Sequence, residues 1–173
     1  MSLFRTHLTN PHDPRSRQIA VLGISLLLAA CGFQLRTQPN IPPEMSRTYM
    51  AADDSYSLFY RRFRDELAKA GVEVVSSRAD ATAIFSILAD YTDQRVLSVS
   101  AQNLPREFEV YYTIHYSVES GKQSIIEPQT LTLTRDYTYD ETLVLGKARE
   151  EELLRQAIVD DLVRIIIKQL SSL

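Results

Sequence analysis

The chain has 173 residues, of which 45% are hydrophobic and 24% are charged, and its formal net charge is −3. This length suits one domain, and the apolar fraction excludes disorder throughout the chain. The single cysteine excludes an internal disulfide framework and a multi-cysteine zinc site, and the negative net charge argues against nucleic acid as a partner.

The N-terminal segment has the pattern of an export signal. Arg15 and Arg17 precede an apolar run at 19–28, which as a helix would rise about 15 Å, half of a bilayer core of about 30 Å. This run is too short to span a membrane and suits the hydrophobic region of a signal peptide. The string LAAC at 28–31 follows and resembles the lipobox of bacterial lipoproteins. We expect cleavage before Cys31 and lipid attachment to it; the alternative is a plain secretory signal with a coincidental cysteine.

This processing would divide the chain into three parts. Residues 1–30 would be removed as a signal peptide, residues 31–46 would form a lipidated tether, and residues 47–173 would form a single α/β domain. The mature chain would carry 16 basic and 21 acidic side chains, a net charge of −5. In lipoproteins, aspartate after the cysteine is associated with retention in the inner membrane, so Gly32 implies the outer membrane, on its periplasmic side. Several acyl chains would hold the protein there, since each buried CH₂ contributes roughly 0.8 kcal/mol.

An amphipathic helix is predicted early in the mature chain. Phe59, Phe63 and Leu67 recur every four residues, with charged residues between them. The segment 53–55 offers N-cap chemistry, and Gly71 stands where a glycine would end the helix. Residues 48–51 form a possible short strand before it.

Long strands with one polar face are predicted next. Residues 108–119 alternate between apolar and polar side chains, and 129–139 alternate in the same way. Residues 84–101 form a long, interrupted strand. The polar positions are rich in Thr, Ser and Glu, so each strand is half-buried in an antiparallel sheet.

A second, longer helix at 147–170 completes the predicted fold. The apolar set of this helix is broad, and we favour cover by its own sheet over contact with a partner. The order strand, helix, three strands, helix defines an α+β fold in which two helices pack on one face of a roughly four-stranded, mainly antiparallel sheet. The other face would be uncovered and polar, with long edges that invite pairing. A partner that surrounds the domain would cover both the polar face and the strand edges.

No pattern for catalysis or metal binding is found. His115 is the only histidine beyond residue 12, and its place on the polar face of a strand favours a solvated side chain over a catalytic one. Metal sites usually take His or Cys clusters. We interpret the carboxylates at 150–152 and 160–161 as solvated helix faces rather than an acid/base pair. We therefore expect no enzyme activity, no metal and no cofactor.

Three arginines crowd the first predicted helix: Arg61, Arg62 and Arg64. They would either contact phosphate or form an ordinary solvated face with pairs such as Arg61–Asp65, and we favour the solvated face.

A second basic group lies at the start of the last predicted helix. Lys147 and Arg149 follow the loop 141–146, and these basic side chains, beside the apolar residues at 143–145, would be placed to contact the phosphates of an amphiphile. The alternative is a lysine at a helix start with no functional role.

Several passages resemble one known family. The mature start CGFQLR at 31–36, the passage 67–75, the strand opening at 107–110 and the Leu-Gly-Lys string at 145–147 are similar to the lipopolysaccharide-assembly lipoprotein LptE family. The resemblance covers nearly all of residues 31–170. It implies a plug that sits inside the β-barrel LptD, helps this barrel to assemble, and helps deliver lipopolysaccharide to the outer leaflet.

The resemblance also implies where lipopolysaccharide binds. In this family the contact is expected on basic residues of strand ends and loops, and Lys147 matches such a position, with Arg149 and Arg106 as further candidates. The loop 101–104 departs from the pattern because it has no basic residue, which leaves Arg95 or Arg106 as substitutes.

Two other functions stay open from the residues alone. One is another outer-membrane lipoprotein of similar size, such as an auxiliary component of a lipid transporter. The other is a small periplasmic hydrolase that uses carboxylates alone, since such chemistry needs only two carboxylates brought together by folding.

Overall fold

The structure is a computed structural model that describes residues 39–138 and 144–173, with side chains from residue 149 onward in the second range. The folded unit spans Gln38–Leu173. Its helices and strands follow one another as β1 (Arg47–Ala51), α2 (Leu58–Lys69), β2 (Glu73–Val75), β3 (Ala83–Val99), β4 (Pro105–Ser120), β5 (Gln123–Thr138) and α3 (Val144–Leu170), with single 3₁₀ turns at Pro43–Met45 and Arg78–Asp80.

The strands form one five-stranded sheet in the order β2-β1-β3-β4-β5. β1 runs parallel to both β2 and β3, while β3, β4 and β5 form an antiparallel meander. The predicted α+β class is confirmed, and the predicted count of roughly four strands becomes five. The additional strand is β2, which has only three residues and pairs with β1 through registers such as Thr48↔Val74.

Helix α2 has the predicted apolar face and the predicted end. Phe59, Phe63 and Leu67 are fully buried. Gly71 adopts a φ of +85°, and the Val72 N–H donates to the Leu67 carbonyl at 3.0 Å, as expected for a glycine-terminated helix. The predicted cap at 53–55 is wrong, because Ser57 caps the helix by accepting from the Tyr60 N–H at 3.1 Å.

A bulge in β3 decides which of its residues face the helices. The register against β4 shifts between Ile87 and Ala89. Ahead of the bulge Phe85 and Ile87 point into the core, and beyond it Asp90 stands opposite the buried Ile114. The extra residue thus moves the inward-facing positions from odd to even numbers.

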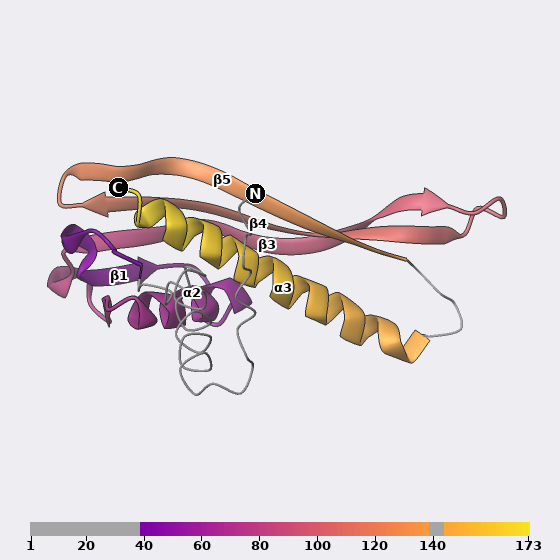
Figure 1. The fold of residues 1–173 in the computed structure, drawn as a ribbon. Coiled ribbons are helices and arrows are strands. Elements are labelled where there is room, and N and C mark those ends of the chain that lie inside the picture. Colours follow the sequence, from indigo (N-terminus) through magenta and orange to yellow (C-terminus); the bar gives the residue numbers. More distant parts are fainter. Residues whose placement is uncertain (1–38, 139–143) are drawn as a thin grey trace, which may run out of the picture. The chain divides into compact units, whose positions relative to one another are not determined.

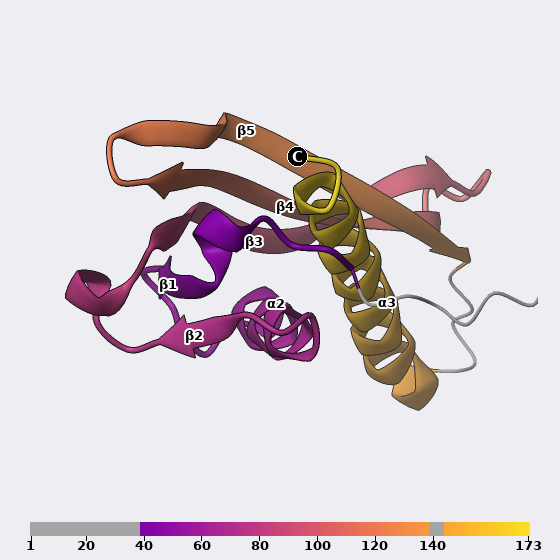
Figure 2. The same cartoon turned by 60° about the vertical axis from the view of Figure 1, so that its left-hand side comes forward.

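Helices α2 and α3 lie on the same side of the sheet, as the two views in Figure 1 and Figure 2 show. Most of the apolar side chains of α3 are buried inside the domain: Ile158, Val159, Leu162, Val163, Ile166, Ile167 and Leu170. The core also includes Met45, ahead of β1, with Ile41 packed against it. Among the described residues, neither helix has the length and apolar character to cross a membrane.

Candidate binding surfaces on the sheet

The side of β3, β4 and β5 that faces away from α2 and α3 is here called the outer face. Its residues follow from the strand register in rows of three, for example Ala89–His115–Thr130 and Tyr91–Thr113–Thr132. Hydroxyl side chains dominate it, and Thr113 and Thr132 share a hydrogen bond of 2.8 Å between their hydroxyls. The predicted polar sheet face is therefore present, and no described helix lies on it.

Strand β5 carries most of the exposed hydroxyls of the outer face. Thr130, Thr132, Thr134 and Thr138 alternate along it and are all exposed. β5 is also the last strand of the sheet. These side chains offer donors and acceptors to a partner along one whole margin of the domain.

A second surface lies where β3 runs beyond its pairing with β1, which ends at Ser86. We call residues 88–110 the distal hairpin. Of the ten exposed large apolar side chains among the described residues, six lie in it: Leu88, Tyr91, Val96, Leu97, Val99 and Leu104. Such a concentration of exposed apolar side chains is typical of an interaction site.

An aromatic row crosses the helix-side face of the distal hairpin. Val96, Phe108 and Tyr137 are register neighbours on three strands, and the rings of Phe108 and Tyr137 stack with centroids 5.5 Å apart. The Tyr137 hydroxyl donates to Gln94 Oε1 at 2.9 Å. Burial and the charges of Glu151 and Glu150 raise the pKa of Tyr137. The first turns of α3 therefore lie near this row.

The basic residues predicted to contact lipopolysaccharide lie in different places, and one of their side chains is outside the described residues. Arg106 is exposed at the start of β4, two residues from Phe108, and Arg149 is exposed in α3 next to Glu150. Among the described side chains, neither has an ion-pair partner. The Lys147 side chain and Cys31 lie outside the described residues. Arg95 is on the outer face, where it pairs with Glu109 and lies 5.8 Å from the centre of the Tyr111 ring.

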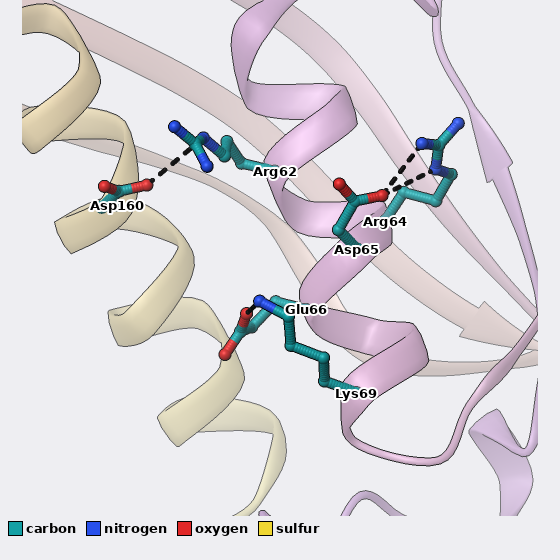
Figure 3. A network of polar contacts seen from close by, with 6 residues as sticks. All are labelled: Arg62, Arg64, Asp65, Glu66, Lys69 and Asp160. Carbon is teal, nitrogen blue, oxygen red and sulfur yellow. Dashed lines mark hydrogen bonds and ion pairs between the residues drawn. The ribbon is translucent and has the colours of Figure 1, made fainter.

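The three arginines of α2 are mostly engaged in ion pairs. Figure 3 shows Arg62 reaching Asp160 of α3 at 3.6 Å and Arg64 bonding the neighbouring Asp65 at 2.9 Å. The predicted Arg61–Asp65 pair is wrong, because Asp65 is taken by Arg64. The interpretation of this helix side as an ordinary solvated face fits these exposed pairs.

The other titratable residues singled out from the sequence also have structural roles. His115 is half-buried on the outer face of β4, as predicted for a strand histidine. Glu151 pairs with Arg155, Glu152 accepts from Gln156 at 2.8 Å, and Asp161 accepts from Arg135 at 2.6 Å. These α3 carboxylates are thus used by neighbouring side chains.

The exposed apolar set of the distal hairpin is the feature of the candidate surfaces that sequence reasoning missed. The alternation of Leu97 and Val99 with serines was visible. This alternation does not show whether the strand is covered or extends past its neighbour in the sheet, because the extent of cover depends on where β1 ends.

Together the two helices on one side of a five-stranded sheet, the hydroxyl-rich outer face and the distal hairpin define a small α+β domain. The family model described as LptE, lipopolysaccharide-assembly, matches residues 45–170. The chain belongs to the LptE family.

Individual relatives agree with this membership. The LPS-assembly lipoprotein LptE of Yersinia enterocolitica is 26% identical over 153 residues, which cover 87% of this chain and 73% of the relative. The LPS-assembly lipoprotein LptE of Pectobacterium atrosepticum is 23% identical, and the match covers 87% of this chain and 82% of that relative. The solution structure of a lipoprotein B from Nitrosomonas europaea has a TM-score of 0.68 and 27% identity, covering 82% and 91%. The crystal structure of the rare lipoprotein B of Shewanella oneidensis shares the fold, with a TM-score of 0.64 and 24% identity. The match covers 73% of this chain and 94% of that one.

Proposed function

We propose that this protein is an outer-membrane lipoprotein that sits as a plug inside the LptD β-barrel and helps place lipopolysaccharide in the outer leaflet. The lipid on Cys31 would hold it at the periplasmic side of the membrane, and the domain would help the barrel to assemble. Its role would be binding rather than catalysis.

One observation carries this proposal most directly: the described helices α2 and α3 both lie on one face of the sheet (Figure 1 and Figure 2). The outer face exposes threonine hydroxyls along β5. The lumen of a large β-barrel is polar, so hydroxyls and carboxylates of the outer face would find hydrogen-bond partners in it. The family model that matches this chain is described by lipopolysaccharide assembly, which supports the proposed role in placing lipopolysaccharide.

Co-purification tests the plug directly. The tagged full chain is expressed in its own host and recovered from detergent-solubilised outer membranes, and the partner is identified by mass. We expect a barrel protein several times larger in a fixed ratio to the chain. Recovery of the chain alone would reject the plug and would favour another kind of outer-membrane lipoprotein.

The lipid anchor is tested by metabolic labelling. We expect labelled palmitate to enter the protein and to be lost in the Cys31→Ser variant. Equal labelling of both proteins would reject Cys31 as the anchor.

Lipopolysaccharide contact is proposed on Lys147, Arg149 and Arg106. Arg106 lies beside an aromatic row, and a cation next to apolar surface suits the phosphates and acyl chains of this glycolipid. Charge reversal at Lys147 or Arg106 should weaken binding of purified lipopolysaccharide and the integrity of the outer membrane. Reversal of Arg61, an exposed arginine on α2, is the matched control and should leave both unchanged. Equal binding by all three variants would reject the proposed contact.

A further inference from the structure

The outer face of the sheet gathers carboxylates at its distal end. On the outer face, the last three rows are Asp93–Tyr111–Thr134, Arg95–Glu109–Asp136 and Ser98–Glu107–Thr138. They hold four carboxylates and one guanidinium. Asp93, Glu107 and Asp136 are exposed, whereas Glu109 is largely buried and paired with Arg95.

The helix-side face of the sheet has a different composition at the same level. Its rows are Gln94–Val110–Arg135 and Val96–Phe108–Tyr137, which hold one guanidinium group and no carboxylate. Helix α3 adds Asp161, which pairs with Arg135, Glu151, which pairs with Arg155, and Glu150, whose charge acts on Tyr137 together with that of Glu151. Cations and carboxylates are therefore mixed on the helix side.

Alternation along β5 places two neighbouring charges on opposite faces. Arg135 and Asp136 are adjacent in this strand, and successive side chains of a strand point to opposite faces, so Arg135 lies toward the helices and Asp136 points outward. A phosphate-bearing ligand is therefore repelled locally from the outer face.

The outer face also has the chemistry of a protein contact. Tyr91 of β3 is 53% exposed there, and the exposed threonines of β5, two strands away on the same face, offer donors and acceptors. Exposed tyrosine suits the core of a protein interface, and hydroxyls and carboxylates suit a hydrogen-bonded and charged contact with basic side chains.

We propose that the outer face docks against a lysine- and arginine-bearing surface of the partner protein, and that the glycolipid is excluded from this face. This inference rests on the proposed function, in which the partner is the barrel wall.

Two exposed carboxylates on different strands provide the test. Asp93→Lys with Asp136→Lys reverses the outer face, and Asp93→Asn with Asp136→Asn only neutralises it. The control pair Asp53→Lys with Asp80→Lys makes the same charge change at exposed positions outside the sheet. Each full-length variant is checked for folding by circular dichroism, co-purified with the barrel, and titrated with purified lipopolysaccharide.

The reversed pair should lower the recovered barrel roughly tenfold while its lipopolysaccharide binding stays at the wild-type value. The neutralised pair should have a smaller effect in the same direction, and the control pair should have none. Arg106→Glu should show the opposite pattern, with the barrel retained and lipopolysaccharide binding reduced.

Three results would overturn the inference. Full barrel recovery with the reversed pair would show that the outer face is not the docking surface. Equal loss with the control pair would show a general charge effect. A wild-type dimer that the reversed pair abolishes would assign the face to a second copy of this chain. Absence of the barrel from the wild-type preparation is a different outcome, because it rejects the proposed function itself.

Discussion

The Tyr112 hydroxyl donates a hydrogen bond of 2.6 Å to Asp90 Oδ1, which joins β4 to β3 just beyond the bulge. The other carboxylate oxygen of Asp90 accepts from the Ser57 hydroxyl at 2.5 Å, and Ser57 is the cap of α2. One carboxylate thus connects two strands and the start of a helix. Burial, with the hydrogen bond to Asp90 as the second cause, raises the pKa of Tyr112.

Replacing Tyr112 by Phe should destabilise the domain by roughly 2 kcal/mol, because a hydrogen bond to a charged acceptor is lost inside the fold. Urea unfolding followed by circular dichroism measures the change. Tyr56→Phe is the control, since Tyr56 is 85% exposed, and its change should stay within about 0.5 kcal/mol. Equal effects of the two substitutions would show that the Asp90 contact adds nothing.

Truncation of Phe63 to Ala should lower the free energy of unfolding by about 3–5 kcal/mol. The ring of Phe63 is fully buried, with its centroid 4.3 Å from that of Phe85 and 5.5 Å from that of Phe59. It joins α2 to the sheet, so its loss leaves a cavity between two layers. The same urea measurement on Leu153→Ala, at a half-exposed site of α3, should show a much smaller loss.

Gly71→Ala should destabilise the domain by about 1–2 kcal/mol, and Gly71→Asn by less, because Asn adopts a positive φ more readily than Ala. A Cβ at this position would meet nothing within 4 Å, so the whole effect comes from the φ of +85°. Thermal unfolding of both variants measures it. Equal losses for Ala and Asn would contradict this explanation.

The predictable parts of the fold are those that depend on local periodicity. The spacing of Phe59, Phe63 and Leu67 and the position of Gly71 locate α2, and strict alternation locates β4. Strand β2 was not counted as a separate strand because three residues carry too little pattern, and it is fixed by pairing with β1 instead.

The two errors, in the helix cap and in the ion pair, have different causes. Residues 53–55 and Ser57 are all of types that can cap a helix. The hydrogen bond from Ser57 to the distant Asp90 favours Ser57 as the cap. Asp65 was expected to pair with Arg61 on helical spacing, and the structure pairs it with the adjacent Arg64. The inward position of Asp90 follows from the β3 bulge, which no local pattern marks.

Asp161 should make the stability of the domain depend on acid pH. The hydrogen bond from Arg135, with Arg164 as a further partner, lowers the pKa of Asp161 in the folded protein. Its ion pairs therefore stabilise the fold above the unfolded-state pKa of about 3.9, and this contribution is lost as the pH falls through the lower folded-state value.

Comparison of wild type with Asp161→Asn isolates this contribution from the other carboxylates. The variant should have a lower free energy of unfolding at neutral pH, and the difference between the two proteins should shrink at a pH below the folded-state pKa of Asp161. Urea unfolding at a series of pH values measures both. A difference that is constant with pH would show that Asp161 acts by packing rather than by charge.

The apolar side chains of the distal hairpin should matter for binding and not for folding. Leu97 is 46% exposed, Val99 is 53% exposed and Leu104 is 48% exposed. Replacing all three by Ser or Thr should change the free energy of unfolding by less than about 1 kcal/mol, since little buried surface is lost. Binding of the barrel or of lipopolysaccharide should fall, because exposed apolar side chains in one place are stabilised when a partner covers them.

Measuring both ligands on this variant shows which of them covers the hairpin. Leu173 is also exposed, so Leu173→Ser serves as the control and should leave the binding of both ligands unchanged. Loss of lipopolysaccharide binding alone would place acyl chains on the hairpin beside Arg106, and loss of the barrel alone would place the barrel wall there. If the triple variant unfolds much more readily than wild type, these side chains belong to the fold and the distal hairpin is not a separate binding surface.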